Sequence, residues 1–572
     1  MQWSHWLQYG LFLAIVAALV YPVGGYLKRV FAGERTFLDP LLRPIERLVY
    51  RLMGIDPTAE MNWKSYSIAF IVFSLGGTLL LYALLRSQTL LSWYDAAAMP
   101  TPLNPDLALN TAISFATTTT WQAYGGESTM SYTSQMLGLA AQNFLAGAAG
   151  LAVGIAFMRG LAREHTNKLG NFWVDMVRGV LWVLLPISIV GSLVLVWQGV
   201  PMNFNAYTVA TTLSGNQQII AQGPVAGLEL IKNLGTNGGG FFNVNGAHPF
   251  ANPTLLTNLL GMLAIVVLPA ALTNTFGRMI GNQRQGWVLF GVMLFLFAVG
   301  LLLGDLAEQS GNPRLAALGV DSAASASQSG GNMEGKEVRF GVAGSVLAAI
   351  TTSNGATGSY NSMHDSYTPL GGMVPLVNML LGETIFGGLG TGLFSLLFVA
   401  LVGLFIGSLM VGRTPEYLGK KIGATEIKFI SLYTLLMPLV VLTLSGLALA
   451  TNAGRAGLTT NQGAHGFSEI LYAYTSAFTN NGQNFAGLSA NTPFYNISLA
   501  IAMIVGRFGL GILALALAGH LAAQGRKAPS VGTIPTDGLL FATLTIGTLL
   551  VVGGLSYFPA LAMGPIIEQL LL

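Results

Sequence analysis

The stretch Leu234-Gly235-Thr236-Asn237-Gly238-Gly239-Gly240 decides how the rest of this sequence folds. It follows a short apolar segment, residues 224–234, which is about half the length that a membrane-spanning helix needs. Consecutive glycines adopt backbone angles that other residues avoid, so they let several carbonyl groups point at one axis. Non-helical backbone at membrane depth is tolerated only where it lines a polar cavity or is buried in protein. The stretch therefore predicts a re-entrant half-helix followed by an ion-binding loop.

The same arrangement occurs four times, roughly every 120 residues. Three further short apolar segments, residues 109–118, 340–351 and 467–478, each precede a polar stretch. The residues predicted to form the ion filter are Thr118, Thr119, Thr120, Thr236, Asn237, Gly238, Ser353, Asn354, Gly355, Asn480, Asn481 and Gly482. One Asn-Gly is more often a plain turn. Four such stretches in equivalent places predict a pore of fourfold pseudosymmetry.

The residue types in these loops indicate which ion the pore accepts. A potassium ion sheds its water only where rings of oxygen atoms replace it, and backbone carbonyls supply them in potassium channels. Threonine and asparagine add side-chain oxygens, and each half-helix directs a C-terminal end with about half a negative charge towards the ion. No ring of aspartate or glutamate occurs in the loops, which argues against a divalent ion. The sequence predicts a filter for a dehydrated monovalent cation, most of all potassium.

The composition sets the class of the protein. Of 572 residues, 52% are apolar and only 9% are charged, and the mean hydropathy is +0.61. Soluble domains carry about 25% charged residues, so this chain is predicted to be an all-α integral membrane protein in a phospholipid membrane. A net charge of +3 is too small to indicate nucleic acid as a partner. Cysteine is absent, which excludes disulfides and thiolate metal sites.

Hydropathy predicts about ten membrane spans, centred near residues 14, 77, 145, 186, 265, 296, 390, 438, 508 and 547. Most lysines and arginines fall in one set of connecting loops, which the positive-inside rule makes cytoplasmic, so both termini are predicted to lie outside. The predicted units are residues 1–60 (an extra helix and a cytoplasmic loop), 61–168, 169–284, 285–422 and 423–528 (four span–half-helix–filter–span repeats) and 529–572 (an extra helix).

Two charged residues and a glycine cluster are predicted to act below the filter. Arg507 lies in the middle of a span, where a fixed positive charge would oppose a direct path to the cytoplasm; an arginine that only fixes packing is the other interpretation. Glu383 precedes a span broken by Gly387, Gly388 and Gly390. The carboxylate is predicted either to receive the ion and pass it sideways or to bond the exposed backbone of the break. The glycines are a candidate gate.

Other polar residues give weaker signals. Gln122 and Glu127 follow the first filter stretch and either shape the entrance for cations or simply form hydrogen bonds. The six histidines are scattered without metal-ligand spacing. No metal site is therefore predicted beyond potassium in the filter.

Four stretches resemble the potassium-binding A subunit of the Kdp potassium-transporting ATPase, and the resemblance covers essentially the whole chain. They are Trp121-Gln122 through Glu127-Ser128-Thr129-Met130-Ser131-Tyr132, Leu234 to Asn243, Asn361-Ser362-Met363-His364-Asp365 and Phe478-Thr479-Asn480-Asn481-Gly482. The family's first filter usually carries asparagine where this chain has Thr118 and Thr120; threonine still offers an oxygen, so selectivity is expected to be retained.

The resemblance implies a bacterial inner-membrane complex with a P-type ATPase catalytic subunit, a periplasm-facing accessory subunit and a very small membrane peptide. The chain itself has no Asp-Lys-Thr-Gly phosphorylation motif and no Gly-x-x-x-x-Gly-Lys phosphate loop, so it is predicted not to be catalytic on its own. The expected function is to take up K+ from outside and deliver it towards the ATPase subunit. A self-sufficient potassium channel or symporter of the same architecture is the alternative. A membrane enzyme would need a convergent catalytic constellation, which the sequence lacks.

Overall fold

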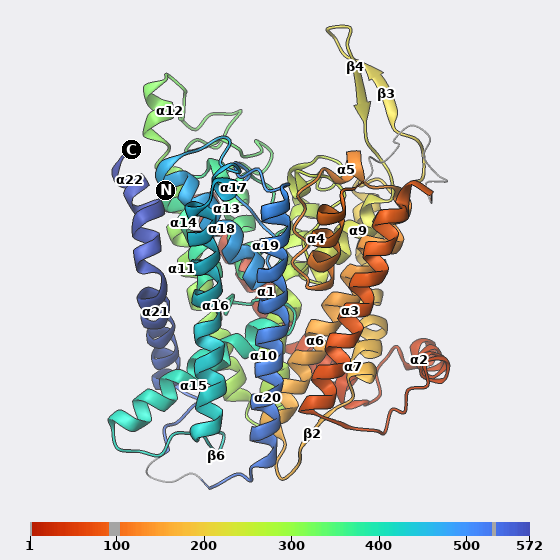
Figure 1. Cartoon of the computed structure of the whole chain (residues 1–572), viewed down its shortest axis with the longest axis vertical. Coiled ribbons are helices and arrows are strands. Elements are labelled where there is room, and N and C mark those ends of the chain that lie inside the picture. Colours follow the sequence, from red (N-terminus) through yellow and green to blue (C-terminus); the bar gives the residue numbers. More distant parts are fainter. Residues whose placement is uncertain (1–2, 91–102, 529–532) are drawn as a thin grey trace.

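In the computed structural model, which describes residues 3–90, 103–528 and 533–572, ten helical segments are long and apolar enough to cross a membrane (Figure 1). This confirms the predicted class and the number of spans. The helices that form them are α1 (Trp3–Ala32), α3 (Trp63–Ser87), α6 (Ala141–Ala162), α7 (Phe172–Arg178) with α8 (Leu185–Trp197), α10 (Leu255–Ile280), α11 (Gln283–Gln309), α15 (Thr391–Met410), α16 (Ala424–Ala450), α19 (Pro493–Ile504) with α20 (Leu510–Ala523), and α21 (Leu539–Leu561).

The spans divide into a central group and a peripheral group. The most apolar window of the span that contains α6 is 89% buried, whereas that of α1 is 28% and that of α21 is 22% buried. Glycines explain the close packing of α6, since small residues let backbones approach each other. A Cβ on Gly154 would lie 2.6 Å from the Cα of Gly390, and one on Gly160 would lie 2.6 Å from Ala518. The two extra helices at the ends of the chain pack on the outside, α1 against α10 and α21 against α15.

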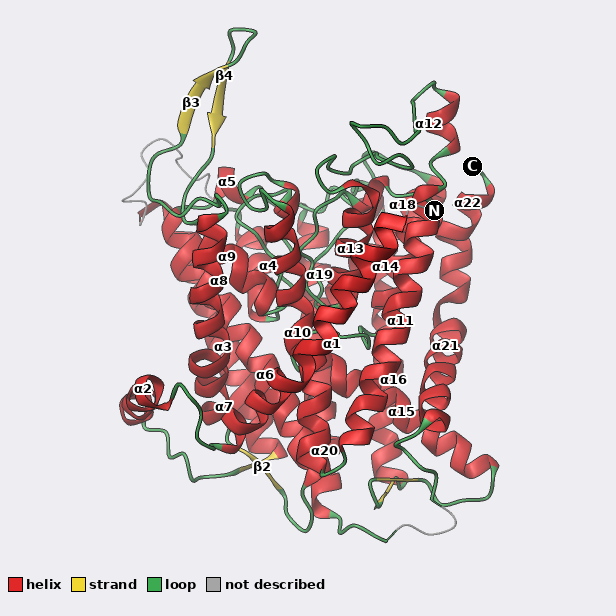
Figure 2. Cartoon of the chain, turned by 180° about the vertical axis from the view of Figure 1, so that it is seen from behind, coloured by secondary structure: helices red, strands yellow, loops and turns green. Residues whose placement is uncertain are grey.

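Four of the short helices between the spans each lead into one of the predicted polar loops: α4 (Pro105–Ala116), α9 (Val225–Leu234), α13 (Gly341–Asn354) and α18 (Gly463–Thr479). All four lie in the upper half of the molecule in Figures 1 and 2. They correspond to the four predicted half-helices. The third runs to Asn354 rather than to Thr351, which moves the start of the loop that follows it.

The span predicted to be broken by glycines consists of two helices. The first is α14 (Pro369–Leu380) and the second is α15, and residues 381–390 between them form turns and bends rather than helix. Glycine accounts for the break, and no proline is involved. Gly382 and Gly390 have positive φ angles of +75° and +94°, which an α-helix does not allow. The break lies deep in the fold, since most of its residues are buried.

Strands are few and short (Figure 2). A hairpin projects from the upper face, with β3 (Thr208–Thr211) antiparallel to β4 (Gln217–Ile220). Two smaller pairs lie near the opposite end: β1 (Met61–Asn62) with β2 (Lys168–Gly170), and β5 (Glu416–Tyr417) with β6 (Lys420–Lys421). The remaining short helices are α2 (Asp39–Met53), α5 (Gly126–Thr129), α12 (Pro313–Ala317), α17 (Asn452–Arg455) and α22 (Ile567–Leu570).

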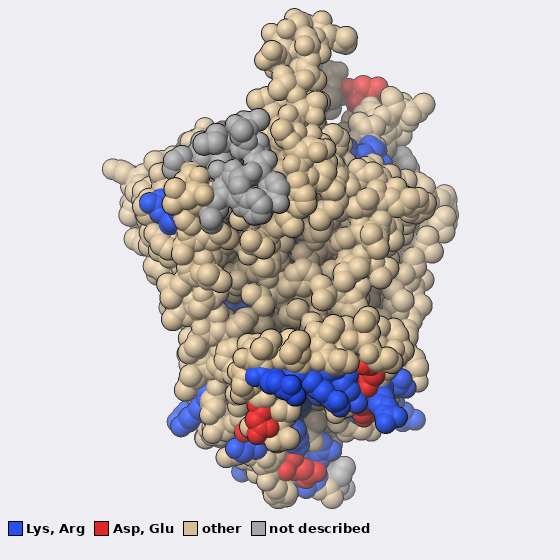
Figure 3. Space-filling view, turned by 90° about the vertical axis from the view of Figure 1, so that its right-hand side faces the viewer, with Lys and Arg blue, Asp and Glu red and all other residues tan. Residues whose placement is uncertain are grey.

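The two faces of the molecule differ in charge. The start of α1 and the end of α22 lie near the upper face, whereas α2 extends sideways near the lower end (Figure 1). Figure 3 shows lysine and arginine side chains gathered at the lower end, below a broad band with few charged atoms. This distribution agrees with a membrane band that has a basic region at one end.

Candidate ion filter and the cavity beneath it

Each short helix ends at a loop with the same unusual backbone pattern. In every loop two residues that are two positions apart have positive φ angles between +48° and +96°. These pairs are Thr118 and Thr120, Thr236 and Gly238, Ala356 and Gly358, and Asn480 and Gly482. Positive φ is uncommon for residues other than glycine and costs about 1 kcal/mol or more. Its recurrence at four equivalent places indicates one specified loop conformation with fourfold pseudosymmetry.

The four loops interlock in a closed ring. In three of them the last residue is a glycine that packs against the carbonyl oxygen of the middle residue of the next loop. A Cβ on Gly238 would lie 1.5 Å from Thr357 O, one on Gly358 2.5 Å from Asn481 O, and one on Gly482 1.9 Å from Thr119 O. Contacts this close leave no room for a side chain. The last residue of each of these three loops must therefore be glycine because of the packing between loops as well as because of its φ angle.

The fourth contact of the ring involves Thr120, which has a Cβ where the other loops have glycine. Its hydroxyl donates a hydrogen bond to Asn237 O and accepts one from Gly239 N at 2.7 Å. Threonine therefore closes the ring between the first and second loops by a hydrogen bond instead of by close packing. The first quadrant thus keeps a connection to its neighbour with threonine in place of glycine.

The third loop begins later than the sequence indicated. Ser353 and Asn354 are the last residues of α13, and Gly355 caps that helix with a φ of −78°. The side chain of Asn354 donates to Ile350 O at 3.0 Å within its own helix. The residues with the filter backbone pattern are instead Ala356 and Gly358, with Thr357 between them. The sequence prediction matched Asn354-Gly355 to the Asn-Gly pairs of other loops, and the longer α13 displaces the register by three residues.

The residues predicted at the filter entrance connect the first loop to the second. Gln122 Nε2 donates to Gly240 O at 3.0 Å, and Gly240 N donates to Gln122 Oε1 at the same distance. Glu127 Oε2 accepts a hydrogen bond from Asn243 N at 2.9 Å. Both side chains thus hold the outer parts of the two loops together.

The glycine break lies directly against the filter loops. Leu389 N donates to Thr236 Oγ1 at 2.9 Å. Gly390 packs so closely on α6 that a Cβ there would lie 2.3 Å from Gly150 O. The predicted gate residues Gly387 and Gly388 are buried in the same turn, and a Cβ on Gly387 would lie 1.6 Å from Glu383 O. The break is therefore tightly packed in this conformation.

Glu383 is buried beside the fourth filter loop. It is 4% exposed and has a positive φ of +52°. Its Oε1 accepts a hydrogen bond from Asn481 Nδ2 at 2.8 Å, and the same amide group donates to Ser353 O at 3.1 Å. Asn481 therefore joins the break, the end of α13 and the fourth filter loop.

Arg507 is buried in a π-helical turn, Val505–Gly509, between α19 and α20. Its Nη2 donates to Ala146 O at 2.8 Å, and the guanidinium carbon lies 5.7 Å from the ring centroid of Phe70. No ion pair to an acidic side chain is formed by Arg507 within the described residues. A buried positive charge without a counter-ion raises the local potential, so the geometry fits a barrier to cations as well as a packing role.

A cavity of about 110 Å³ lies beneath the filter loops. Its lining includes the first positive-φ residue of every loop: Thr118, Thr236, Ala356 and Asn480. Glu383 and Arg507 line it too. The cavity also reaches Met437 on α16 and Ser556 on α21, so it extends sideways towards the surface of the bundle.

The family model described as the potassium-transporting ATPase A subunit matches residues 10–570 of this chain. Two relatives are named as the potassium-binding subunit of a potassium-transporting ATPase. One, from Methylobacterium nodulans, is 54% identical over 569 residues, which cover 99% of this chain and 97% of that protein. The other, from Rhodopseudomonas palustris, is 53% identical over 569 residues, which cover 100% and 98% of the two chains.

A solved structure has a similar fold. The potassium transporter TrkH from Vibrio parahaemolyticus superposes with a TM-score of 0.50 at 13% sequence identity, over 88% of this chain and 95% of that one. At this identity the similarity concerns the fold alone.

Proposed function

Since the chain belongs to the family of potassium-transporting ATPase A subunits, we propose that it is the potassium-binding, ion-selective subunit of an ATP-driven potassium uptake complex. It takes K+ from the outside and delivers it towards a partner ATPase subunit. The complex lies in a bacterial inner membrane with both ends of this chain outside the cytoplasm, as the basic lower face supports.

The ring of four interlocked loops is the observation that carries this proposal. The loops bring the C-terminal ends of four short helices together, and each end carries about half a negative charge. The repeated positive φ angles turn consecutive peptide groups in a way that can present backbone oxygens to one axis. Glycine at Gly238, Gly358 and Gly482 keeps the ring closed, which holds the oxygens at a fixed spacing. Such a ring replaces the hydration shell of a K+ ion.

The cavity and Arg507 support a sideways exit rather than a direct one. The positive charge lines the cavity below the filter, where it opposes passage of K+ straight through the bundle. The glycine break fills the space beneath the second loop. The cavity instead extends to α16 and α21. Glu383, at its wall, offers a carboxylate to the ion on this route.

Hydrolysis of ATP belongs to the partner in this proposal. The sequence contains neither of the phosphate-handling motifs sought above. The partners implied by the resemblance are a P-type ATPase catalytic subunit, a periplasm-facing accessory subunit and a small membrane peptide. The transported K+ is the only ion that this function requires of the chain.

Uptake of rubidium or potassium into potassium-starved cells that lack other uptake systems tests the proposal. The chain is expressed alone or with the candidate ATPase subunits, and uptake is expected only with the partners. Gly238→Ala is expected to abolish it, because the added methyl group would meet Thr357 O. Gly291→Ala on α11, where a Cβ meets nothing within 4 Å, is the matched control and leaves uptake unchanged. Uptake by the chain alone would instead support a self-sufficient channel or symporter.

A further inference from the structure

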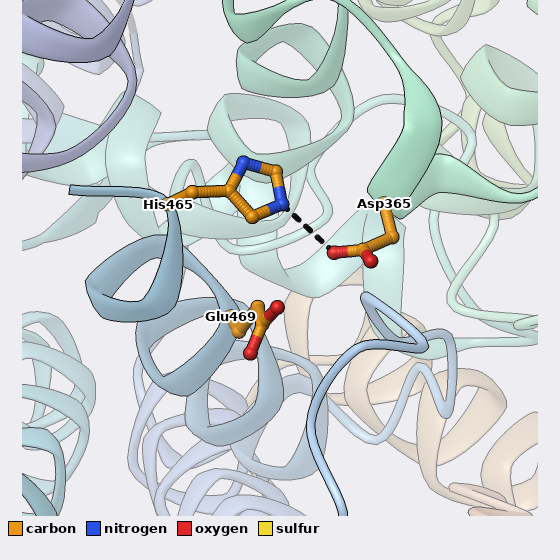
Figure 4. Close-up of side chains that lie close together, drawn as sticks. All are labelled: Asp365, His465 and Glu469. Carbon is orange, nitrogen blue, oxygen red and sulfur yellow. Dashed lines mark hydrogen bonds and ion pairs between the residues drawn. The ribbon is translucent and has the colours of Figure 1, made fainter. Parts of the chain in front are cut away.

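Three side chains that can bind a metal ion lie together around the beginning of α18, whose other end leads into the fourth filter loop (Figure 4). They are Asp365, His465 and Glu469, and one potential ligand atom from each lies within 4.8 Å of the others. Asp365 belongs to a turn, His364–Ser366, that precedes α14. His465 and Glu469 are one turn apart on α18, and this spacing places them on one face of the helix. His465 Nε2 lies 2.9 Å from Asp365 Oδ1.

One carboxylate oxygen of Glu469 is unpaired within the part of the chain that the structure describes. The residue is 0% exposed. Its Oε1 accepts a hydrogen bond from Asn461 Nδ2 at 2.8 Å, but its buried Oε2 has no hydrogen-bond partner among the described residues. A buried carboxylate oxygen left unpaired is costly, which is why such groups are normally paired or coordinate metals. Among the ion pairs of the described residues, none joins Asp365 or Glu469 to a lysine or arginine.

The backbone opposite the cluster is shaped for two converging carboxylates. A Cβ on Gly487 would lie 2.2 Å from Glu469 Oε1 and 2.8 Å from Asp365 Oδ2. The absence of a side chain at this position lets both acids approach the same point. Two carboxylates held close together without a cation between them repel each other.

The histidine is oriented by a fourth residue. His465 Nδ1 lies 2.7 Å from Glu568 Oε1 on α22. A histidine that binds a metal through one ring nitrogen usually donates the other N–H to a carboxylate, which fixes the tautomer and the ring orientation. Glu568 occupies this supporting position, and it directs Nε2 of His465 towards Asp365 and Glu469.

We propose that Asp365, His465 and Glu469 bind a divalent transition-metal ion, with Zn²⁺ as the representative, and that Glu568 orients the histidine. The ligand atoms are His465 Nε2 and one carboxylate oxygen each from Asp365 and Glu469, which leave a fourth tetrahedral position for water. Binding releases the proton on His465 Nε2 to solvent, while the Nδ1 proton stays on the imidazole ring and is donated to Glu568. Nitrogen and carboxylate ligands together suit such ions better than K+, which prefers oxygen alone.

The bound ion would connect three parts of the chain. Asp365 precedes α14, His465 and Glu469 lie on the half-helix that leads to Asn480, and Glu568 lies in the last helix. The expected consequence is a stiffer outer end of α18. This inference does not depend on the proposed transport function, because it concerns the binding of a different ion at a separate place.

Metal binding to the full chain, purified in detergent and stripped with a chelator, tests the inference directly. Zn²⁺ bound per chain is measured by elemental analysis and calorimetry, and Co²⁺ is used as a spectroscopic probe of tetrahedral coordination. One ion per chain is expected. His465→Asn and Glu469→Gln should each weaken binding by more than about tenfold, and Glu568→Gln by about tenfold, the low end for loss of a supporting carboxylate.

The controls separate this site from surface binding and from misfolding. His165→Asn removes an exposed histidine outside the cluster and should leave binding unchanged. Addition of Zn²⁺ should raise the thermal midpoint of the unsubstituted chain and not that of His465→Asn. Failure of the unsubstituted chain to bind Zn²⁺ or Co²⁺ would overturn the inference without any variant. Equal binding by His465→Asn would overturn it as well, and would leave the four residues as an internal network of ion pairs.

Discussion

The side-chain amide of Asn481 donates a hydrogen bond to Glu383 at 2.8 Å, and this bond joins the fourth filter loop to the break between α14 and α15. The two residues are far apart in the sequence, and both are buried. The bond makes Glu383 a direct neighbour of the filter and of the cavity beneath it. A change of the carboxylate is therefore expected to affect both the proposed ion path and the position of the break.

Replacement of Glu383 by glutamine should separate transport from binding. In Glu383→Gln the new amide oxygen still accepts the bond from Asn481, so the filter keeps its shape, while the carboxylate that the proposed route offers to K+ is lost. We expect uptake to fall by at least about tenfold, equivalent to roughly 1.4 kcal/mol. The K+ affinity of the purified protein should change much less. An equal loss of uptake and affinity would count against the sideways route.

Loss of the Thr120 hydroxyl should weaken the first quadrant of the filter. Thr120→Val keeps the shape of the side chain but leaves Gly239 N without its acceptor, which costs about 1–3 kcal/mol for a buried donor. We expect weaker K+ binding and poorer discrimination against Na+ in uptake assays. Thr543→Val on α21 is the matched control, since that hydroxyl is exposed and bonds only within its own helix. Unchanged selectivity in Thr120→Val would show that packing alone closes the ring.

The register of the third loop can be tested with two substitutions. Gly358→Ala places a methyl group about 2.5 Å from Asn481 O at a positive φ of +76°, so it should lower K+ affinity by more than about tenfold. Asn354→Ala removes a bond within α13 and should cost far less affinity. Competition binding with Rb+ measures both. A larger effect of Asn354→Ala would restore the filter position inferred from the Asn-Gly pattern.

Removal of the Arg507 charge should open a passive leak. In proteoliposomes without ATP, Arg507→Gln should conduct K+ down its gradient faster than the unsubstituted protein, because the positive barrier beneath the filter is gone. Arg507→Lys keeps the charge and serves as the control. If neither variant conducts K+ passively and both lose stability equally, Arg507 acts through its bond to Ala146 rather than as a barrier to K+.

Acid should destabilise the outer part of the second loop through His248. Burial, assisted by the nearby Arg339, lowers the pKa of His248 to about 4, and its ring stacks on Phe242 with the ring centroids 3.6 Å apart. A depressed pKa means that its contribution to stability is complete above the unfolded value of about 6.5 and is lost as the pH falls through about 4. The thermal midpoint should therefore decrease between pH 6.5 and pH 4. The difference from His248→Asn should correspond to about 1 kcal/mol, allowing for partial exposure of the ring.

Much of the fold follows from local sequence properties. The length and hydropathy of a segment determine whether it crosses the membrane, so the ten spans and the four short helices were predictable. Gly238 and Gly482 were predicted as filter residues because each lies in a loop after a short helix, where the backbone needs angles that glycine adopts easily. Arg507 and Glu383 stood out because charges are expensive inside a membrane.

Tertiary structure decided the rest, because those features depend on where helices end and on what packs against them. The third loop lies three residues beyond Asn354-Gly355, since α13 continues through Asn354 where the local pattern resembled a turn. The ring contact of Thr120 with Asn237 needs two loops to be brought together. Asp365 and His465, about a hundred residues apart, form a cluster only after α14 and α18 have packed. The sequence by itself thus determined which segments enter the membrane and which loops bend, through hydropathy and glycine. Their mutual contacts are long-range, and no local pattern encodes them.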